Sequence, residues 1–216
     1  NMKLLGFDRV LCLSPHPDDI EYSLSGTVMK YQDTHFDLLT MSSGGDFEGS
    51  NNLTRLNEVK ESWNVVDVNN ISVIIDTKLK PKNNSQDELI YNIESKYLKE
   101  YHDAIFVPTC IDSHFEHRIV NELAAPLTRC KSISVIEYRT PSTLNEWSPN
   151  MYIDITKQFD NKIDILSKFN SQKTKWYFKT QLIRHFHADY QSYKKGYKYV
   201  EQLKIKQLYE KPCHKL

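Results

Sequence analysis

Short apolar runs alternate along this chain of 216 residues with segments of helical periodicity, and this order restricts the fold more than any other feature. Alternating strands and helices favour a mostly parallel sheet with helices on both faces. Strands are predicted near residues 9–14, 37–42, 71–76, 103–108, 132–139 and 151–155, and helices near residues 19–32, 54–65, 87–101, 117–130 and 157–170.

Internal repeats and low-complexity linkers are not evident, so we expect a single α/β domain over residues 1–216. The part from about 171 to 216 has weaker periodicity and many aromatic residues. We expect this part to form a helical, aromatic cover or an oligomer contact, because aromatic stripes are more often packing surfaces than binding platforms.

A charged turn follows the first predicted strand. The segment Ser-Pro-His-Pro-Asp-Asp-Ile-Glu at residues 14–21 places one imidazole and three carboxylates within six positions. Prolines on both sides of His16 disfavour helix before each ring, so the helix begins no earlier than about Asp18. Asp18 and Glu21 have the spacing of a capping box, which is the structural alternative. A cap of this kind leaves His16 and Asp19 without a role.

A second polar cluster follows the strand predicted near residues 103–108. Asp112, His114, Glu116 and His117 lie in the turn before the next helical pattern. If the two strands are parallel neighbours, both turns meet at one edge of the sheet, where open α/β sheets bind their ligands. The two clusters together therefore predict a shared site.

Two histidines and a carboxylate are standard ligands of a catalytic zinc ion or a similar divalent ion. His16 and Asp19 are three positions apart across a turn, and one of His114 and His117 completes three protein ligands. The unused histidine and Asp18 are then free to transfer protons. Zinc (Zn2+) is the expected cofactor, and ferrous iron (Fe2+) accepts the same ligands.

These residues resemble the LmbE-like, or PIG-L, family of metal-dependent N-deacetylases. Residues 16–21 match its motif His-Pro-Asp-Asp-x-Glu, and residues 114–118 match its motif His-x-x-His-Arg. One departure is Phe115-Glu116 between the histidines, where many members have Pro-Asp. Another is Asp112, at a position where some members carry a tyrosine. Weaker similarities occur at residues 44–46, 55–58, 148–155, 162–172 and 199–201.

The resemblance implies a Rossmann-like fold and a role for each site residue. Asp18 would be the general base, and His114 would stabilise the transition state, as a cation, or act as general acid. Arg55 would help to hold the substrate, although Arg55 and Glu58 could equally form a charge pair on a helix surface. The metal ligands would be His16, Asp19 and His117, supported from outside by Glu116, Asp112 and Glu21.

The predicted activity is removal of the acetyl group from an N-acetylated amino sugar or its conjugate, in polysaccharide or glycoconjugate biosynthesis. Amide hydrolysis needs an activated water, a polarised carbonyl and a proton for the leaving amine, and a bound metal ion, Asp18 and His114 would supply these. Two alternatives are a metal-dependent hydratase on the same scaffold and a non-catalytic sugar-binding subunit.

Composition restricts the partners and the compartment. The formal net charge is +0 and the sequence pI about 7.2, so a small-molecule sugar is expected as partner and nucleic acid is not. Residues 157–216 hold 14 Lys and Arg against 5 Asp and Glu, which indicates a basic layer on an acidic domain, or a basic rim that recruits a phosphorylated sugar. Unpaired cysteine spacing and the lack of an apolar stretch of roughly 20 residues predict a cytoplasmic protein without a membrane span.

Overall fold

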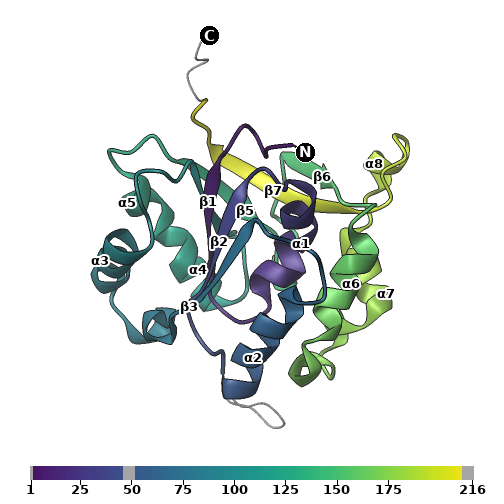
Figure 1. Ribbon diagram of the computed structural model, residues 1–216, viewed down its shortest axis with the longest axis horizontal. Coiled ribbons are helices and arrows are strands. Elements are labelled where there is room, and N and C mark those ends of the chain that lie inside the picture. Colours follow the sequence, from purple (N-terminus) through teal and green to yellow (C-terminus); the bar gives the residue numbers. More distant parts are fainter. Residues whose placement is uncertain (1, 46–51, 211–216) are drawn as a thin grey trace.

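The computed structural model describes residues 2–45 and 52–210, and within them seven strands form one sheet. The strand order is β3-β2-β1-β4-β5-β7-β6 (Figure 1). All six predicted strands are present, and the seventh, β7, was not predicted. The strands are β1 Arg9–Ser14, β2 His35–Thr40, β3 Ile71–Ile75, β4 Ala104–Pro108, β5 Ser134–Tyr138, β6 Met151–Asp154 and β7 Val200–Gln207.

The sheet is mostly parallel. Strands β2 and β3 lie on one side of β1, and the chain then crosses to the other side, where β4 and β5 lie. Strand β1 pairs in parallel with both β2 and β4, and β3 and β5 continue the parallel sheet on either side. The carboxyl ends of β1 and β4 are therefore adjacent, and the crevice between them is the switch point at which open α/β sheets bind ligands. This adjacency was the condition for the two polar turns to meet.

Helices cover both faces of the sheet, as predicted (Figure 1). Along β1, Val10 and Cys12 join one buried apolar cluster, whereas Leu11 and Leu13 join the other. A strand that buries both faces reads as a continuous apolar run. One face carries α1 Asp19–Lys30, α2 Asn52–Trp63, α6 Phe159–Ser167 and α7 Thr180–His187, and the other α3 Gln86–Lys96, α4 Phe115–Glu122 and α5 Ala124–Thr128.

The helix predicted over residues 117–130 is divided into α4 and α5. Pro126 has no N–H, and its ring conflicts with the carbonyl of Glu122, four positions earlier, which is the last residue of α4. Short turns complete the fold: η1 Thr77–Leu79, η2 Pro81–Asn83, η3 Asn170–Gln172, η4 Trp176–Phe178 and α8 Tyr190–Tyr193.

The C-terminal segment is only partly the helical cover that was expected. Strand β7 enters the sheet between β5 and β6 and is antiparallel to both. From this strand the Glu201 carboxylate accepts hydrogen bonds from the backbone N–H groups of Gly26 and Thr27 and from Lys162 Nζ, at 2.8, 2.6 and 2.7 Å. A Cβ on Gly26 would lie 2.6 Å from the side chain of Ile155, so glycine is needed for this close approach.

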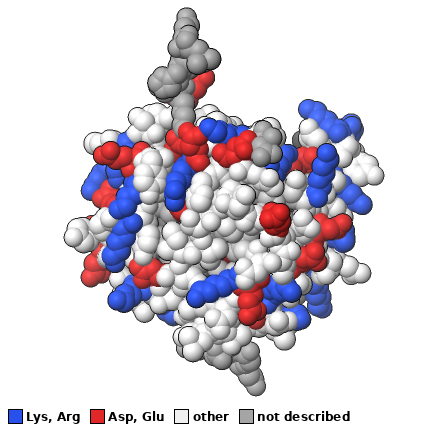
Figure 2. All heavy atoms as spheres, viewed as in Figure 1, with Lys and Arg blue, Asp and Glu red and all other residues white. Residues whose placement is uncertain are grey.

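Charge and cysteine placement add two observations. Figure 2 shows acidic and basic side chains intermixed over one face, with Lys and Arg side chains gathered at the edge where α8 lies. Cys12 is buried, Cys110 partly buried and Cys130 exposed, and all three are free thiols, whereas Cys213 lies outside the described residues. No helix in the described ranges has the length and apolar composition needed to cross a bilayer.

Candidate metal-dependent active site

The turn after β1 places Asp18 in an unusual backbone conformation. Asp18 is the N-cap residue of α1, but its φ of 99° is left-handed and its side chain makes no capping hydrogen bond. The capping-box alternative is therefore wrong. The Glu21 side chain does not reach back to the cap either, since Glu21 Oε1 accepts a hydrogen bond from Trp63 Nε1 at 2.8 Å.

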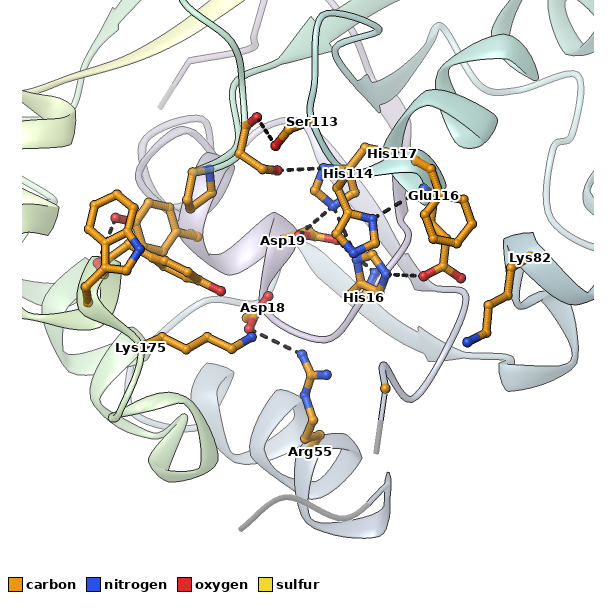
Figure 3. A pocket seen from close by; sticks show the side chains of 17 residues that line it. His16, Asp18, Asp19, Arg55, Lys82, Ser113, His114, Glu116, His117 and Lys175 are labelled. Atoms are coloured by element: carbon orange, nitrogen blue, oxygen red, sulfur yellow. Dashed lines mark hydrogen bonds and ion pairs between the residues drawn. The ribbon is translucent and has the colours of Figure 1, made fainter. Parts of the chain in front are cut away.

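Three buried side chains from the two turns converge on one point (Figure 3). His16 Nδ1 lies 3.2 Å from His117 Nε2 and 3.2 Å from Asp19 Oδ2, and His117 Nε2 lies 3.3 Å from Asp19 Oδ1. Ligand atoms about 2.0–2.1 Å from a zinc ion lie about 3.3–3.4 Å apart at the corners of a tetrahedron. The spacing of these donor atoms thus fits a small divalent ion.

Two carboxylates set the orientation of the two rings. His16 Nε2 lies 2.8 Å from Glu116 Oε2, and His117 Nδ1 lies 2.9 Å from Asp112 Oδ2. A carboxylate accepts the ring hydrogen on its own side, which leaves the opposite nitrogen of each neutral ring with its lone pair. The lone pairs of His16 Nδ1 and His117 Nε2 therefore face the shared point. Thr140 Oγ1 holds Asp112 in turn, at 2.6 Å.

His114 belongs to the same group but differs in its hydrogen bonds. His16, His114 and His117 each offer one atom within 4.8 Å of the others, so the three histidines could hold a metal ion. His114 Nδ1, however, accepts the backbone N–H of Glu116 at 3.3 Å. In the neutral ring the hydrogen is then on Nε2, which makes this atom a donor rather than a ligand.

The electrostatics of the site favour a cation. Burial alone lowers the pKa of His117, but the Asp19 and Asp112 carboxylates outweigh it and raise the pKa of His117 to about 10. Burial likewise opposes ionisation of Asp19, but His117 and His16 outweigh it and hold the pKa of Asp19 well below its usual value. Burial and the neighbouring His16 and His117 lower the pKa of His114 to about 4, so this ring is neutral at pH 7 in the metal-free arrangement.

Arg55, on α2, contacts the Asp18 carboxylate. Arg55 is buried, and its Nη2 donates to the Pro17 carbonyl at 3.0 Å and to Asp18 Oδ2 at 3.4 Å. Burial raises the pKa of the Asp18 carboxyl to about 6, although Arg55 opposes this. A Cβ at Gly44, whose φ is 79°, would come within 1.7 Å of Arg55 Nη1, so glycine is required beside the guanidinium.

Arg55 and Glu58 do not form the surface charge pair considered as an alternative. Glu58 is buried, and it accepts hydrogen bonds from the backbone N–H and the hydroxyl of Ser171, at 2.8 and 2.6 Å. Of the glycine-rich segment near residues 44–46, Asp46 lies outside the described residues.

A cavity of about 610 Å3 opens over this cluster. Sequence reasoning did not identify Lys82, Lys175, Trp176 and Tyr177, which also line it. Figure 3 shows the Lys175 side chain extending toward Asp18. The signal for these residues was the run Lys-Thr-Lys-Trp-Tyr-Phe-Lys at residues 173–179, in which cationic side chains flank three consecutive aromatic ones. The aromatic residues were interpreted as a cover or an oligomer contact, and the lysines only as part of the basic C-terminal segment.

The fold and the buried histidine and carboxylate cluster at its switch point define a class of α/β proteins with a candidate metal site. The sequence model of the PIG-L family, described as GlcNAc-PI de-N-acetylase, matches residues 11–128. The match covers both motifs and more than half of the chain, so the protein belongs to this family of deacetylases.

Similar proteins agree with this assignment. The diacetylchitobiose deacetylase of Thermococcus kodakarensis is 27% identical in an alignment of 190 residues that covers 76% of this chain and 70% of the relative. A solved structure of the N,N'-diacetylchitobiose deacetylase of Pyrococcus horikoshii has a TM-score of 0.72 at 23% identity and covers 94% of this chain and 85% of its own. At such identity, the structural likeness shows the fold alone.

The fold also occurs in a protein with another reaction. The 4-carboxy-2-hydroxymuconate hydratase GalB of Pseudomonas putida has a TM-score of 0.70 at 14% identity and covers 97% of this chain and 100% of its own. Fold similarity therefore does not distinguish between the deacetylase and hydratase interpretations, and the choice depends on the site.

Proposed function

We propose that this protein hydrolyses the acetamido group of an N-acetylated amino sugar or its conjugate, in a metal-dependent reaction that yields acetate and a free amine. The observation that carries the proposal is the convergence of His16 Nδ1, His117 Nε2 and the Asp19 carboxylate beside a second carboxylate, that of Asp18, which has no capping role. Membership of a deacetylase family supports the reaction class.

The donor set fits zinc, and ferrous iron would accept the same ligands. We assign His16, Asp19 and His117 as the ligands, because in the neutral rings the Glu116 and Asp112 carboxylates would hold the ring hydrogens away from the shared point. The hydrogen bond to His114 Nδ1 supports leaving His114 out of the ligand set. When bound, the ion supplies Lewis-acid polarisation of the acyl oxygen and lowers the pKa of a coordinated water to about 7.

The chain's own groups would move the protons and stabilise the developing charge. Asp18 would accept the proton of the attacking water and then donate it to the nitrogen of the departing amine, with Arg55 fixing the direction of its carboxylate. His114 would donate a hydrogen bond from Nε2 to the acyl oxygen as negative charge builds there, an interaction whose loss costs about 10²–10³ in rate. Arg55 also lines the cavity, so its guanidinium can contact the sugar.

Two further observations support the substrate class and the compartment. The relatives from Thermococcus and Pyrococcus are named as deacetylases of diacetylchitobiose, an N-acetylated sugar. The three free thiols among the described residues suit a reducing compartment such as the cytoplasm.

A chelation experiment tests the proposal. Protein stripped with a chelator and reloaded with zinc or ferrous iron is incubated with a panel of N-acetylated sugars, and acetate and new primary amines are measured. We expect both products in equal amounts, only after reloading. His117→Ala should lose the bound metal and the activity, whereas the matched control His35→Ala, in a partly exposed residue of β2 remote from the site, should keep both.

Three results would overturn the proposal. Metal bound in equimolar amount without acetate release would favour a non-catalytic sugar-binding subunit. Addition of water to an unsaturated acid without acetate release would favour a hydratase. Full turnover in the continued presence of chelator would remove the metal from the reaction.

A further inference from the structure

A second cavity of about 960 Å3 adjoins the catalytic one. The two cavities share four lining residues, so they form one continuous hollow in the surface. The second lies between the end of β5 and the segment from η4 to the start of β7. The shared residues are Tyr22, Pro141, Trp176 and Tyr177.

Arg139 is the central cation of this second cavity. One guanidinium nitrogen, Nη1, donates to the Phe186 carbonyl at 3.2 Å and to Gln202 Oε1 at 3.0 Å. Over the described ranges, no carboxylate lies within ion-pair distance of Arg139, and its Nε and Nη2 donate to no protein group. Arg139 lines the cavity, and its guanidinium lies over the Phe186 ring, 4.2 Å from the ring centre. A half-buried guanidinium at a cavity suits an anionic ligand, because paired N–H groups bind phosphate or carboxylate in a bidentate way.

Two more cations, Arg184 and Lys198, line the same cavity, and both lie close to the Tyr199 ring. Arg184 Nη1 donates to the Tyr199 hydroxyl at 2.9 Å, and Lys198 Nζ lies 5.6 Å from the centre of the ring. The carboxylate nearest to Arg184 is that of Asp160, at 3.9 Å with a side chain 94% exposed, which neutralises little of the charge. One carboxylate, that of Asp189, lines the cavity against these three cations.

Tyr22 connects this cationic wall with the catalytic cluster. Burial, opposed by Arg139 and reinforced by Asp18, raises the pKa of the Tyr22 phenol, so the ring lies within electrostatic reach of both groups. A sugar whose acetamido group is over the metal cluster would therefore extend past Tyr22 toward Arg139. Whatever is attached to the sugar on that side meets the three cations.

We propose that the second cavity binds a phosphate ester attached to the N-acetylated sugar, so that the substrate is a sugar phosphate or a nucleoside diphosphate sugar. This inference rests on the proposed deacetylase function and adds the class of substrate. Arg139, Arg184 and Lys198 would contact the phosphate oxygens. The exposed rings of Trp176, Tyr190 and Tyr193 at the same cavity offer a stacking surface for a nucleobase.

Calorimetry on metal-free protein tests the cavity separately from catalysis, because a diphosphate would otherwise bind the metal ion. The probes are uridine diphosphate, N-acetylglucosamine 1-phosphate and the neutral methyl glycoside of N-acetylglucosamine. We expect both phosphates to bind more tightly than the neutral sugar, by at least roughly tenfold, as charged hydrogen bonds predict. Tighter binding of uridine diphosphate would show that a second phosphate or the nucleoside adds to the affinity, and equal binding of both would identify a single phosphate as the group recognised.

Substitutions of cavity residues test whether the phosphates bind in the second cavity. Arg139→Gln and Lys198→Gln should each weaken binding of the phosphates by roughly tenfold, and Lys198→Gln guards against misfolding because its side chain is exposed. Lys96→Gln, an exposed charge on α3, is the matched control and should leave binding unchanged. With metal restored, the ratio of kcat/KM for the phosphate to kcat/KM for the neutral sugar should fall in the two cavity variants.

The two proposals fail in different ways. Phosphate binding that Arg139→Gln and Lys198→Gln weaken, in a protein that deacetylates nothing, would overturn the deacetylase function and leave the phosphate cavity in place. Deacetylation of neutral sugars with no preference for phosphates, and with binding unaffected by either variant, would overturn the cavity proposal alone.

Discussion

The protein buries charged groups in two places, and the partners that neutralise these charges differ between the two. The Lys162–Glu201 pair is fully buried, and each partner is saturated by the chain: Glu201 by three donors on α1 besides the lysine, and Lys162 by Ser25 Oγ and the Glu21 carbonyl. The cluster of His16, Asp19 and His117 is almost as buried, yet its ligand atoms converge on one point, where the metal-free chain balances the Asp19 charge only by protonation of a histidine ring.

The difference distinguishes a structural ion pair from a candidate metal site. Buried charges that the chain satisfies completely connect elements, here α1, α6 and β7. Buried ligand atoms that converge on one point and are balanced there by a ring proton can exchange that proton for a metal ion. Four predictions test this distinction, and they are arranged from the largest expected effect to the smallest.

Asp18→Asn should lower kcat by about 10²–10⁴, because it removes the proposed proton acceptor while keeping the shape of the side chain. The free energy of unfolding should change by no more than about 1 kcal/mol, and the bound metal should stay equimolar. Steady-state kinetics, urea unfolding and metal analysis on the same preparation check this. Unchanged turnover would assign the proton transfer to another group.

Glu201→Gln should show the reverse pattern, with a loss of about 3–5 kcal/mol in the free energy of unfolding, because it leaves the Lys162 ammonium buried and uncompensated. The double variant Lys162→Met with Glu201→Leu should recover much of the loss. Urea unfolding measures both, with the exposed Glu146→Gln as control. A single variant as stable as the parent would mean that the pair is not a structural element.

Asp112→Asn should weaken zinc binding by about 10–100-fold, because Asp112 orients the His117 ring and fixes its hydrogen on Nδ1. Competition with a chromophoric chelator measures the affinity. Asp67→Asn, at an exposed position, is the matched control. Equal affinities in the two variants would show that the ring needs no such support.

The smallest effect concerns Asp37, at the opposite end of β2 from the site. Burial opposes its charge, but hydrogen bonds from His102 and Arg9 outweigh it and hold the pKa of Asp37 well below its usual range. The folded state then binds fewer protons than the unfolded chain, whose Asp pKa is about 3.9, so this stabilisation is present above that pH and is lost as the pH falls further. Unfolding of metal-free protein between pH 7 and pH 3 should show a weaker pH dependence in Asp37→Asn, and an unchanged one would contradict the prediction.

The sequence predicted the parallel part of the sheet well, because strands such as β1 bury both faces and read as uninterrupted apolar runs. It did not predict β7. Lys204 and Lys206 interrupt the apolar pattern of this strand, and Glu201 is buried there in an ion pair with Lys162. Pairing across such distances in the chain is not visible in local periodicity.

The candidate site, like the sheet, could be predicted from the sequence only in part. Both turns and their residues could be selected because they follow strands β1 and β4. The hydrogen-bond partner of Glu116 could not be predicted, since this side chain bonds His16, 100 positions away, rather than its neighbour His114. The ring nitrogens available to a metal depend on such contacts, which only the folded chain forms.

The left-handed backbone conformation of Asp18 also affects the stability of the protein. A left-handed residue with a side chain typically costs about 1–3 kcal/mol, whereas glycine adopts that conformation without penalty. Asp18→Gly should therefore melt at a higher temperature than Asp18→Ala, since both variants lose the contact with Arg55 and only alanine keeps the strain. The aspartate thus occupies a backbone position at which glycine would be the less strained residue.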